Sequence, residues 1–395
     1  VLTTDEADRR ARVRPLAAAG VPFEVFELLA RRLDLAELPA DATFEFTIAA
    51  SGATTECRVA APRGVPAGAR LPLLLTLHTT SEPADFRRNR FARTLTAAGW
   101  IVAAPHSSPN FGKGWGSREV ERSVAVSALD ALLRRYPVDP DRVFLNGASM
   151  GGNGCWEIGM LHRDRFAGLA PNIAGPRIRN FPLLVNLGGL PLLSTIGADE
   201  DALMVEANRE AIAFLRDGLG SPARLHEEPA WGHVEKPEEW DPRLVQWGAE
   251  LGRDVFPRGL VHHFALESQF RHHWIRAERT SGVVVDPTEG KIPVDARGTE
   301  AQRRAEYVTR GRARCARLAA RVDGQTIRIA TRSAPKVTLW LSDALVDLSR
   351  PVTVELNGKQ VFKGTVERSL ETLVTEIAAS RDTGRVFAAR LILPK

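Results

Sequence analysis

The sequence predicts a doubly wound α/β fold with a mostly parallel sheet, followed by a C-terminal β-rich domain that resembles a sandwich. Two observations support the parallel sheet. Short, continuously apolar runs are typical of strands buried on both faces, and an amphipathic segment of helical length follows each run. Beyond residue 258, alternating segments joined by Asp-Gly and Asn-Gly turns indicate hairpins and predict the β-rich domain.

The composition sets limits on the class of protein. The 395 residues are enough for two or three domains, and 44% of them are hydrophobic while 26% are charged, as in globular proteins. No apolar run approaches the roughly 20 residues of a membrane span. Although the formal net charge is +5, basic residues are interspersed with acidic ones, which argues against a nucleic-acid-binding surface. Oligomeric state stays open.

The cysteines and the first residues bear on the cellular compartment. Cys57, Cys155 and Cys315 are far apart, so we expect neither a disulfide framework nor a cysteine zinc site, although one disulfide stays open. The chain as given begins at Val1 without the pattern of a signal peptide. Secreted, periplasmic and cytoplasmic locations are therefore all compatible with it.

We expect three consecutive domains. Residues 1–40 form an N-terminal helical segment, residues 41–257 the α/β domain, and residues 258–395 the β-rich accessory domain. The α/β domain opens with an antiparallel hairpin of two alternating segments. Six apolar strands follow, with helices between them at 118–136 and 205–219. The strands are expected at 71–78, 100–106, 142–147, 166–175, 190–197 and 223–229. In the accessory domain, a helix at 367–381 precedes the last strand.

The sequence GASMG, at residues 147–151, has the pattern GxSxG and lies between a predicted strand and a predicted helix. A serine on so sharp a turn has strained backbone angles that only small neighbours permit, and the turn exposes its hydroxyl. Ser149 is therefore the candidate nucleophile. The free amides at the start of the helix favour developing negative charge, so we expect the Met150 amide to donate to an oxyanion.

A serine nucleophile requires a base and an acid later in the chain. His233 follows the last predicted strand of the sheet and is the candidate base. The acid is expected in the cluster of Asp199, Glu200 and Asp201, which follows the strand before it. Asp201 is preferred because residues 201–204, DALM, resemble the Asp-x-Leu-Val found at the acid of enzymes with a serine nucleophile. Glu200, three residues beyond Gly197, is the alternative, and Asp199 ranks third.

The loop after strand 71–78 is expected to supply a second oxyanion amide, from Thr80 in preference to Thr79. Aromatic side chains near the strand ends are candidates for substrate binding, with simple packing of their loops as the alternative. They are Phe111, Trp115 and Trp231.

Other charged and histidine-containing segments receive the ordinary interpretation. Arg87, Arg88 and Arg90 are expected to face water, with binding of a carboxylated substrate as the alternative. Two histidine pairs, 262–263 and 272–273, are interpreted as sheet residues, because two ligands without a third are a weak metal site. No metal or organic cofactor is expected.

The segments DPDRVFLNGASMGGNGCW and HRDRFAGLAPNIAG resemble the α/β-hydrolase superfamily. They are most similar to esterases related to feruloyl esterases and polyhydroxyalkanoate depolymerases, and to catalytic domains of prolyl oligopeptidases. The similarity covers roughly residues 70 to 250. After the strand that precedes the oxyanion loop, at 71–78 in this chain, the family has His-Gly, whereas this chain has His78-Thr79-Thr80. The resemblance implies a serine hydrolase of small or polymer-attached carboxylic esters.

Two other functions stay open. One is a peptidase of the prolyl-oligopeptidase type, although only about 70 residues precede the first apolar strand, where that family carries a large propeller. The other is a non-catalytic hydrolase-fold or glycan-binding protein whose function lies in the β-rich domain.

Overall fold

The computed structural model describes residues 6–32, 41–80, 82–107, 114–115, 118–289, 291–295 and 297–393. They group into two compact units. The sheet unit comprises residues 36–253 and 287–313, and the sandwich unit comprises residues 1–35, 254–286 and 314–395. This grouping interleaves the three expected domains. The N-terminal helices fall with the β-rich segment, and residues 287–313 fall with the parallel sheet.

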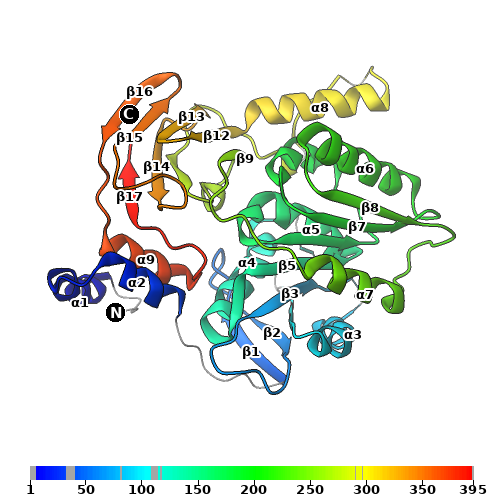
Figure 1. The fold of residues 1–395 in the computed structure, drawn as a ribbon. Helices are drawn as coiled ribbons and strands as arrows, with labels where there is room; N and C mark the ends of the chain where they lie inside the picture. Colours follow the sequence, from blue (N-terminus) through cyan, green and yellow to red (C-terminus); the bar gives the residue numbers. More distant parts are fainter. Residues whose placement is uncertain are drawn as a thin grey trace. The chain divides into compact units, whose positions relative to one another are not determined.

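Within the described residues, the sheet unit is built on eight strands in the order β1-β2-β4-β3-β5-β6-β7-β8 (Figure 1). The strands are β1 (Asp41–Thr47), β2 (Thr54–Ala60), β3 (Leu71–Leu77), β4 (Ile101–Pro105), β5 (Val138–Ala148), β6 (Gly168–Asn172), β7 (Leu192–Gly197) and β8 (Ala223–Glu228). β1 pairs antiparallel with β2, and β2 with β4, whereas all neighbours from β4 to β8 are parallel. The predicted mostly parallel α/β sheet is confirmed.

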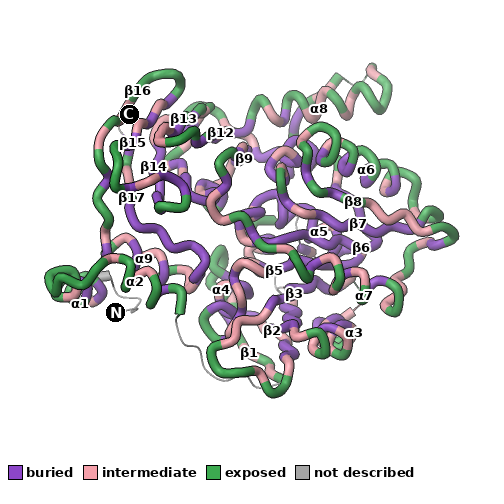
Figure 2. Tube along the Cα trace, viewed as in Figure 1, coloured by how far each residue is buried: buried purple, intermediate pink, exposed green. Residues whose placement is uncertain are grey.

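Helices cover both faces of this sheet, which is why its central strands are apolar throughout (Figures 1 and 2). They are α3 (Ala84–Ala97), α4 (Glu119–Arg135), α5 (Met150–His162), α6 (Ala202–Ala213) and α7 (Pro237–Gly248). Phe91 of α3 and Leu244 of α7 share a buried cluster with Leu74 of β3. α5 packs on the other face, where Gly159 lies so close to Leu169 that an added Cβ would meet it at 2.3 Å.

The strand order creates a switch point in the sheet. β3 precedes β4 and β5 in sequence but lies between them, so the chain leaves β3 toward one edge and later builds toward the other. Loops diverge there, and open α/β sheets bind ligands in the resulting crevice at the carboxyl ends of the strands. The turn that follows β5 carries Ser149 to this edge of the sheet.

The sandwich unit contains two sheets, with strand orders β10-β11-β14-β17 and β16-β15-β13-β12-β9 in its described part. The strands are β9 (Gly259–Phe264), β10 (Arg271–His272), β11 (Ile275–Arg279), β12 (Ala316–Asp323), β13 (Thr326–Arg332), β14 (Lys336–Leu341), β15 (Val352–Leu356), β16 (Lys359–Gly364) and β17 (Ala389–Ile392). Leu318 of β12 and Leu339 of β14 belong to one buried cluster, so the sheets share a core. The predicted β-rich region is confirmed.

The Asp-Gly and Asn-Gly turns lie where the sequence predicts them, between β12 and β13 and between β15 and β16. At the second turn Asn357 and Gly358 have φ of 50° and 78°, the left-handed values that this pair tolerates. β13 and β15 pair in parallel, which alternation of side chains does not indicate.

Three helices belong to the sandwich unit: α1 (Glu6–Ala18), α2 (Phe23–Arg31) and α9 (Leu370–Ser380). Val13, Ala30 and Leu373, one from each, lie in a common apolar cluster, which explains why the N-terminal helices group with the C-terminal strands. A further helix, α8 (Glu300–Arg314), has no counterpart in the sequence analysis. Arg304 of α8 donates to Glu210 of α6 at 2.8 Å, so this helix joins the sheet unit. The described residues also form 3₁₀ segments, η1 (Arg163–Arg165), η2 (Ile178–Leu187), η4 (Glu267–Gln269) and η5 (Pro287–Glu289), and a π-helical segment, η3 (Phe214–Gly218).

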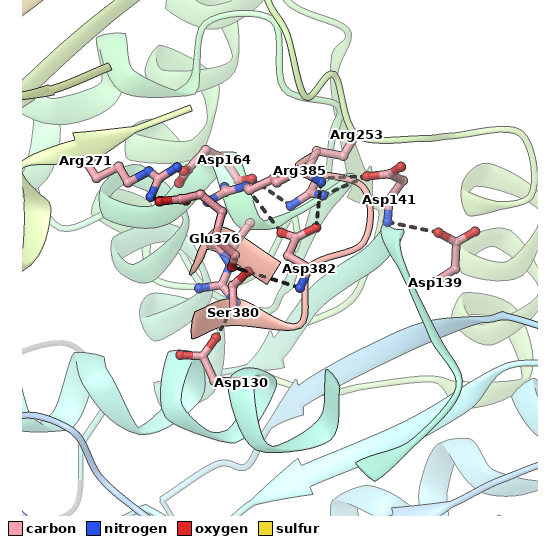
Figure 3. Close-up of polar contacts among 11 residues, drawn as sticks. Asp130, Asp139, Asp141, Asp164, Arg253, Arg271, Glu376, Ser380, Asp382 and Arg385 are labelled. Carbon is pink, nitrogen blue, oxygen red and sulfur yellow. Dashed lines mark hydrogen bonds and ion pairs between the residues drawn. The ribbon is translucent and has the colours of Figure 1, made fainter. Parts of the chain in front are cut away.

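Ion pairs connect separate elements within each unit (Figure 3). In the sheet unit, Arg253 follows α7 and bonds Asp141 of β5 at 2.7 Å. In the sandwich unit, Arg271 of β10 contacts Glu376 of α9 at 2.6 Å. Across the described ranges, no helix is long and apolar enough to cross a membrane.

Candidate active site

Ser149 occupies a strained turn between β5 and α5. Its φ of 52° and ψ of −118° are rare for a residue with a side chain. The two glycines of the motif are required by contact. A Cβ on Gly147 would lie 2.2 Å from the Gly151 carbonyl oxygen, and one on Gly151 would lie 2.2 Å from the Leu77 carbonyl oxygen. The Ser149 amide donates to the Asn172 carbonyl of β6 at 3.0 Å, which holds the turn.

The structure brings Ser149, His233 and Glu200 into one hydrogen-bonded chain. The Ser149 hydroxyl and His233 Nε2 are 2.8 Å apart, and His233 Nδ1 lies 2.5 Å from Glu200 Oε2. A carboxylate can only accept, so Nδ1 carries the proton and Nε2 accepts from the hydroxyl. The Glu200 side chain is 8% exposed and that of His233 is 47% exposed, so the imidazole faces solvent while its carboxylate is sheltered.

The loop that carries His233, residues 229–236, packs against the loop that carries Glu200. The Asp199 amide donates to the Trp231 carbonyl at 2.8 Å. β7 ends at Gly197, where a Cβ would lie 2.1 Å from that same carbonyl oxygen. Only glycine permits this close approach.

The sequence-based preference for Asp201 is not what the structure shows. Asp201 is the N-cap of α6, and its Oδ1 accepts from the amides of Leu203 and Met204 at 3.1 and 3.2 Å. The carboxylate that faces His233 is that of Glu200, the alternative. Asp199 is exposed and contributes its backbone amide rather than its side chain. Aspartate before a helix is a strong capping residue, which explains the pattern that suggested Asp201.

The loop expected to supply the second oxyanion amide, at residues 78–80, lies against the Ser149 turn, since a Cβ on Gly151 would be 2.8 Å from the His78 carbonyl oxygen. Ser107 N–H donates to Nε2 of His78 at 3.1 Å, so the imidazole proton is on Nδ1, which donates to the Thr79 carbonyl at 2.7 Å. Burial lowers the pKa of His78, in agreement with a neutral ring. Thr80 follows at an exposed position, and the Met150 amide opens α5. Oxyanion roles for Met150 and Thr80 stay predictions.

The aromatic residues proposed to bind substrate have other surroundings. Trp115 is 1% exposed, and its indole N–H donates to the His78 carbonyl at 2.9 Å. Trp231 is 6% exposed, with the Lys236 ammonium 4.4 Å from its ring centroid. Both side chains therefore pack inside the loops that carry His78 and His233. Phe111 lies outside the described residues.

The histidine pairs lie within the sandwich unit and are buried. His262 and His272 lie in strands, as expected, with ring centroids 4.2 Å apart, whereas His273 lies in the turn after β10 with a φ of 51°. The described ranges hold no group of three or more histidine, cysteine or acidic side chains arranged for a metal ion. Cys57, Cys155 and Cys315 are free thiols, so the disulfide left open by the sequence is not formed.

The arginines of α3 contradict the sequence interpretation. Arg87 is fully buried and Arg90 has a 5% exposed side chain, so neither faces water. Arg87 contacts Glu235, two residues after His233, at 2.5 Å. Sequence reasoning missed this partner because Glu235 lies 148 residues away.

Comparisons with known proteins concern about half of the chain. No family model matches it. It is 24% identical, over 200 residues, to the bifunctional acetylxylan esterase/xylanase XynS20E of Neocallimastix patriciarum, a match that spans 50% of this chain and 28% of that relative. A thermostable esterase structure is 21% identical, covers 54% of this chain and 64% of its own, and has a TM-score of 0.45. A ferulic acid esterase is 17% identical with 52% and 95% coverage and a TM-score of 0.41.

The chain's own geometry decides its fold. A mixed sheet in the order 1-2-4-3-5-6-7-8 places a strained serine after the fifth strand, and the acid and histidine follow on later loops. This order of serine, acid and histidine on an α/β sheet is the α/β-hydrolase arrangement. The sheet unit therefore has a fold of the α/β-hydrolase type.

Proposed function

We propose that this protein is a serine hydrolase of carboxylic esters, with Ser149 as nucleophile, His233 as general base and Glu200 as the acid that orients it. The observation that supports this most is the hydrogen-bonded chain of 2.8 and 2.5 Å from Ser149 through His233 to Glu200. A serine alcohol is a weak nucleophile until a base within hydrogen-bond reach removes its proton.

Acylation follows from this geometry. Ser149 Oγ attacks the ester carbonyl carbon while Nε2 of His233 takes the hydroxyl proton. The bond between the carbonyl carbon and the leaving oxygen then breaks, and Nε2–H protonates the departing alcohol. Glu200 stabilises the imidazolium through Nδ1–H and keeps the ring in the tautomer that can accept from serine.

Deacylation reverses these roles with water. His233 removes a proton from a water molecule, which attacks the acyl carbon. The bond between that carbon and Ser149 Oγ then breaks, and His233 returns the proton to Oγ as the carboxylic acid leaves. The 47% exposure of the His233 side chain leaves it open to that water. In both halves we assign the negative oxygen to the amides of Met150, at the positive end of α5, and Thr80.

We propose carboxylic esters in general as the substrate class. Because the curated relative is an acetylxylan esterase/xylanase, acetylated xylan and small acetyl esters belong in the first substrate panel. A proline amide should be included as the test for peptidase activity.

Steady-state kinetics test the proposal. We expect turnover of p-nitrophenyl acetate by the wild type and loss of it in Ser149→Ala and in His233→Ala, while both variants keep the wild-type melting temperature. Turnover of the amide but not of any ester would favour the peptidase, and activity in Ser149→Ala equal to wild type would reject the serine mechanism.

A further inference from the structure

We propose that Glu235 is a positioning residue, which Arg87 and Asn172 hold in place so that the His233 loop stays in register with the Ser149 turn. This inference rests on the proposed function of Ser149 and His233. It concerns a buried group of charges that the serine mechanism does not itself use.

Glu235 connects three elements of the sheet unit. Its Oε2 lies 2.5 Å from Arg87 Nη1 of α3, and its Oε1 accepts from the Asn172 side-chain amide at 2.7 Å. Arg87 is fully buried, and the Glu235 side chain is 11% exposed. A carboxylate and a guanidinium taken out of water are stable only when they are paired and hydrogen-bonded, so the geometry of this group is tightly set.

Asn172 gives the group its connection to the nucleophile. Its backbone carbonyl accepts the Ser149 amide at 3.0 Å, while its side chain donates to Glu235. One residue at the end of β6 thus contacts both the serine turn and the loop that carries the histidine. Asn172 is 1% exposed and sits between them as a fixed spacer.

The His233 loop needs this second attachment. On its N-terminal side, the Trp231 carbonyl accepts from the Asp199 amide, which fixes the loop to the Glu200 side of the site. On its C-terminal side, Glu235 fixes it to the Ser149 side. His233 lies between the two attachments, with its Nε2 2.8 Å from Oγ, so a loss of either is expected to change that distance.

The charge state of Glu235 supports the same role. Burial alone would raise the pKa of Glu235, but the positive charges of Arg87 and Arg90 outweigh burial and hold it below its usual value. The carboxylate therefore stays ionised at neutral pH, as its contact with Arg87 requires.

A set of four proteins separates positioning from stability alone. Replacing a buried pair by apolar residues of similar size is often neutral for stability, whereas removing one partner is strongly destabilising. The variants are Glu235→Gln, Arg87→Met and the double variant Arg87→Met with Glu235→Met. The matched control is Asp241→Asn, because Asp241 is a buried carboxylate that shares Arg90 with Glu235, at 3.2 and 3.6 Å, but takes no part in the Asn172 bridge.

Each protein is measured by thermal unfolding, by kcat and KM with p-nitrophenyl acetate, and by the rate of fluorophosphonate labelling from pH 5 to 9. We expect Arg87→Met to be the least stable and the double variant to regain stability. We also expect the double variant to keep a kcat about 10- to 100-fold below wild type, with KM changed little, as a misplacement of about 1 Å produces. The kcat of Glu235→Gln should lie between that of wild type and that of the double variant. The kcat of Asp241→Asn should match that of wild type.

The pH profile of labelling is the readout that stability alone would not move. We expect its acid limb to shift in the double variant, because a displaced His233 has a different environment. A double variant with wild-type kcat and wild-type pH profile would overturn the positioning role. If the wild type is neither labelled nor active, the proposed function itself fails, which is a different outcome from any of these.

Discussion

At the scale of residues, the sequence can predict which residue types form a site, but which side chains contact one another depends on the loops. The contact between Ser149 and His233 could be predicted from the sequence, because the glycines indicate an exposed serine on a strand-to-helix turn and the histidine follows the last strand of the sheet. Glu200 could not be separated from its acidic neighbours, since the choice depends on how the loop after β7 turns. Asp201 instead satisfies two orphan amides of α6, a role that a short polar side chain performs wherever a helix begins.

The contacts of the acidic residues lead to opposite expectations for two isosteric changes. Glu200→Gln removes the charge that stabilises imidazolium, so kcat should fall by at least about 100-fold with little change in stability. Asp201→Asn keeps a good capping residue, so its kcat should stay within about 2-fold of wild type, while Asp201→Ala should lose about 1 kcal/mol of unfolding free energy. Kinetics and urea unfolding of the three proteins check this. A large loss of kcat in Asp201→Asn alone would reassign the acid.

The same scale explains the error in the arginine prediction and the surroundings of the tryptophans. Arg87 was expected to face water but is fully buried, and Trp115 and Trp231, the candidates for substrate binding or loop packing, are at most 6% exposed. Trp115 finds a hydrogen-bond acceptor in the His78 carbonyl, and Arg87 finds Glu235. Such partners are distant in sequence, so composition around a residue does not reveal them.

At the scale of elements, the strand-to-helix turn between β5 and α5 depends on close backbone contacts. Most strands of the sheet could be predicted because buried apolar runs of this length have few alternatives, and the predicted segments overlap the observed strands. α8 could not, since charged residues dominate its sequence and few of its positions are apolar. Its attachment to α6 is instead a cross-element ion pair.

The turn makes a prediction about glycine. In Gly151→Ala the new Cβ would lie 2.2 Å from the Leu77 carbonyl oxygen, so β3 and α5 must separate. We expect a loss of about 1–3 kcal/mol, with a fall in Tm of roughly 2–12 °C and a lower kcat. The control is Gly252→Ala, whose Cβ would have its nearest neighbour at 3.8 Å and should change stability by less than about 0.5 kcal/mol. Equal melting temperatures for the two variants would contradict the contact argument.

The packing of α3 on α7 makes a prediction about pH. Burial raises the pKa of Asp241 to about 6, although Arg90 lies 3.2 Å away and lowers it in part. The folded protein therefore holds this proton more tightly than the unfolded chain, so protonation stabilises the fold at low pH and this contribution is lost as pH rises through about 6. The stability of wild type relative to Asp241→Asn should fall from pH 4.5 to 7.5 in urea unfolding. A difference that is constant across this range would refute the shift.

At the scale of the whole molecule, the two compact units differ from the expected succession of domains. The change from continuous apolar runs to alternating segments near residue 258 does mark the start of the β-rich region, but α8 belongs again to the sheet unit. The N-terminal helices join α9 through apolar side chains some 340 residues away, since Ala30 and Leu370 share one cluster. Discontinuous units of this kind cannot be predicted from local composition, which carries no information about which distant segments meet.

Both units carry buried thiols, two in the sheet unit and one in the sandwich unit, and this allows the unfolding of each unit to be followed separately. Cys57 and Cys155 report on the sheet unit and Cys315 on the sandwich unit. Burial raises the pKa of all three, that of Cys315 to about 12, so the reactive thiolate is scarce in the folded state. We expect Ellman's reagent to modify none within minutes in native buffer, and each cysteine to react at the urea midpoint of its own unit. Rapid modification of native protein would contradict this burial.

The most direct measurement of the central claim is the site of covalent modification by a fluorophosphonate, mapped by peptide mass spectrometry. We predict a single adduct on Ser149, at least about 100-fold slower labelling in His233→Ala, and no adduct in Ser149→Ala. Ester turnover by the wild type with no adduct, or with an adduct on another residue, would contradict the assignment of Ser149 as the nucleophile.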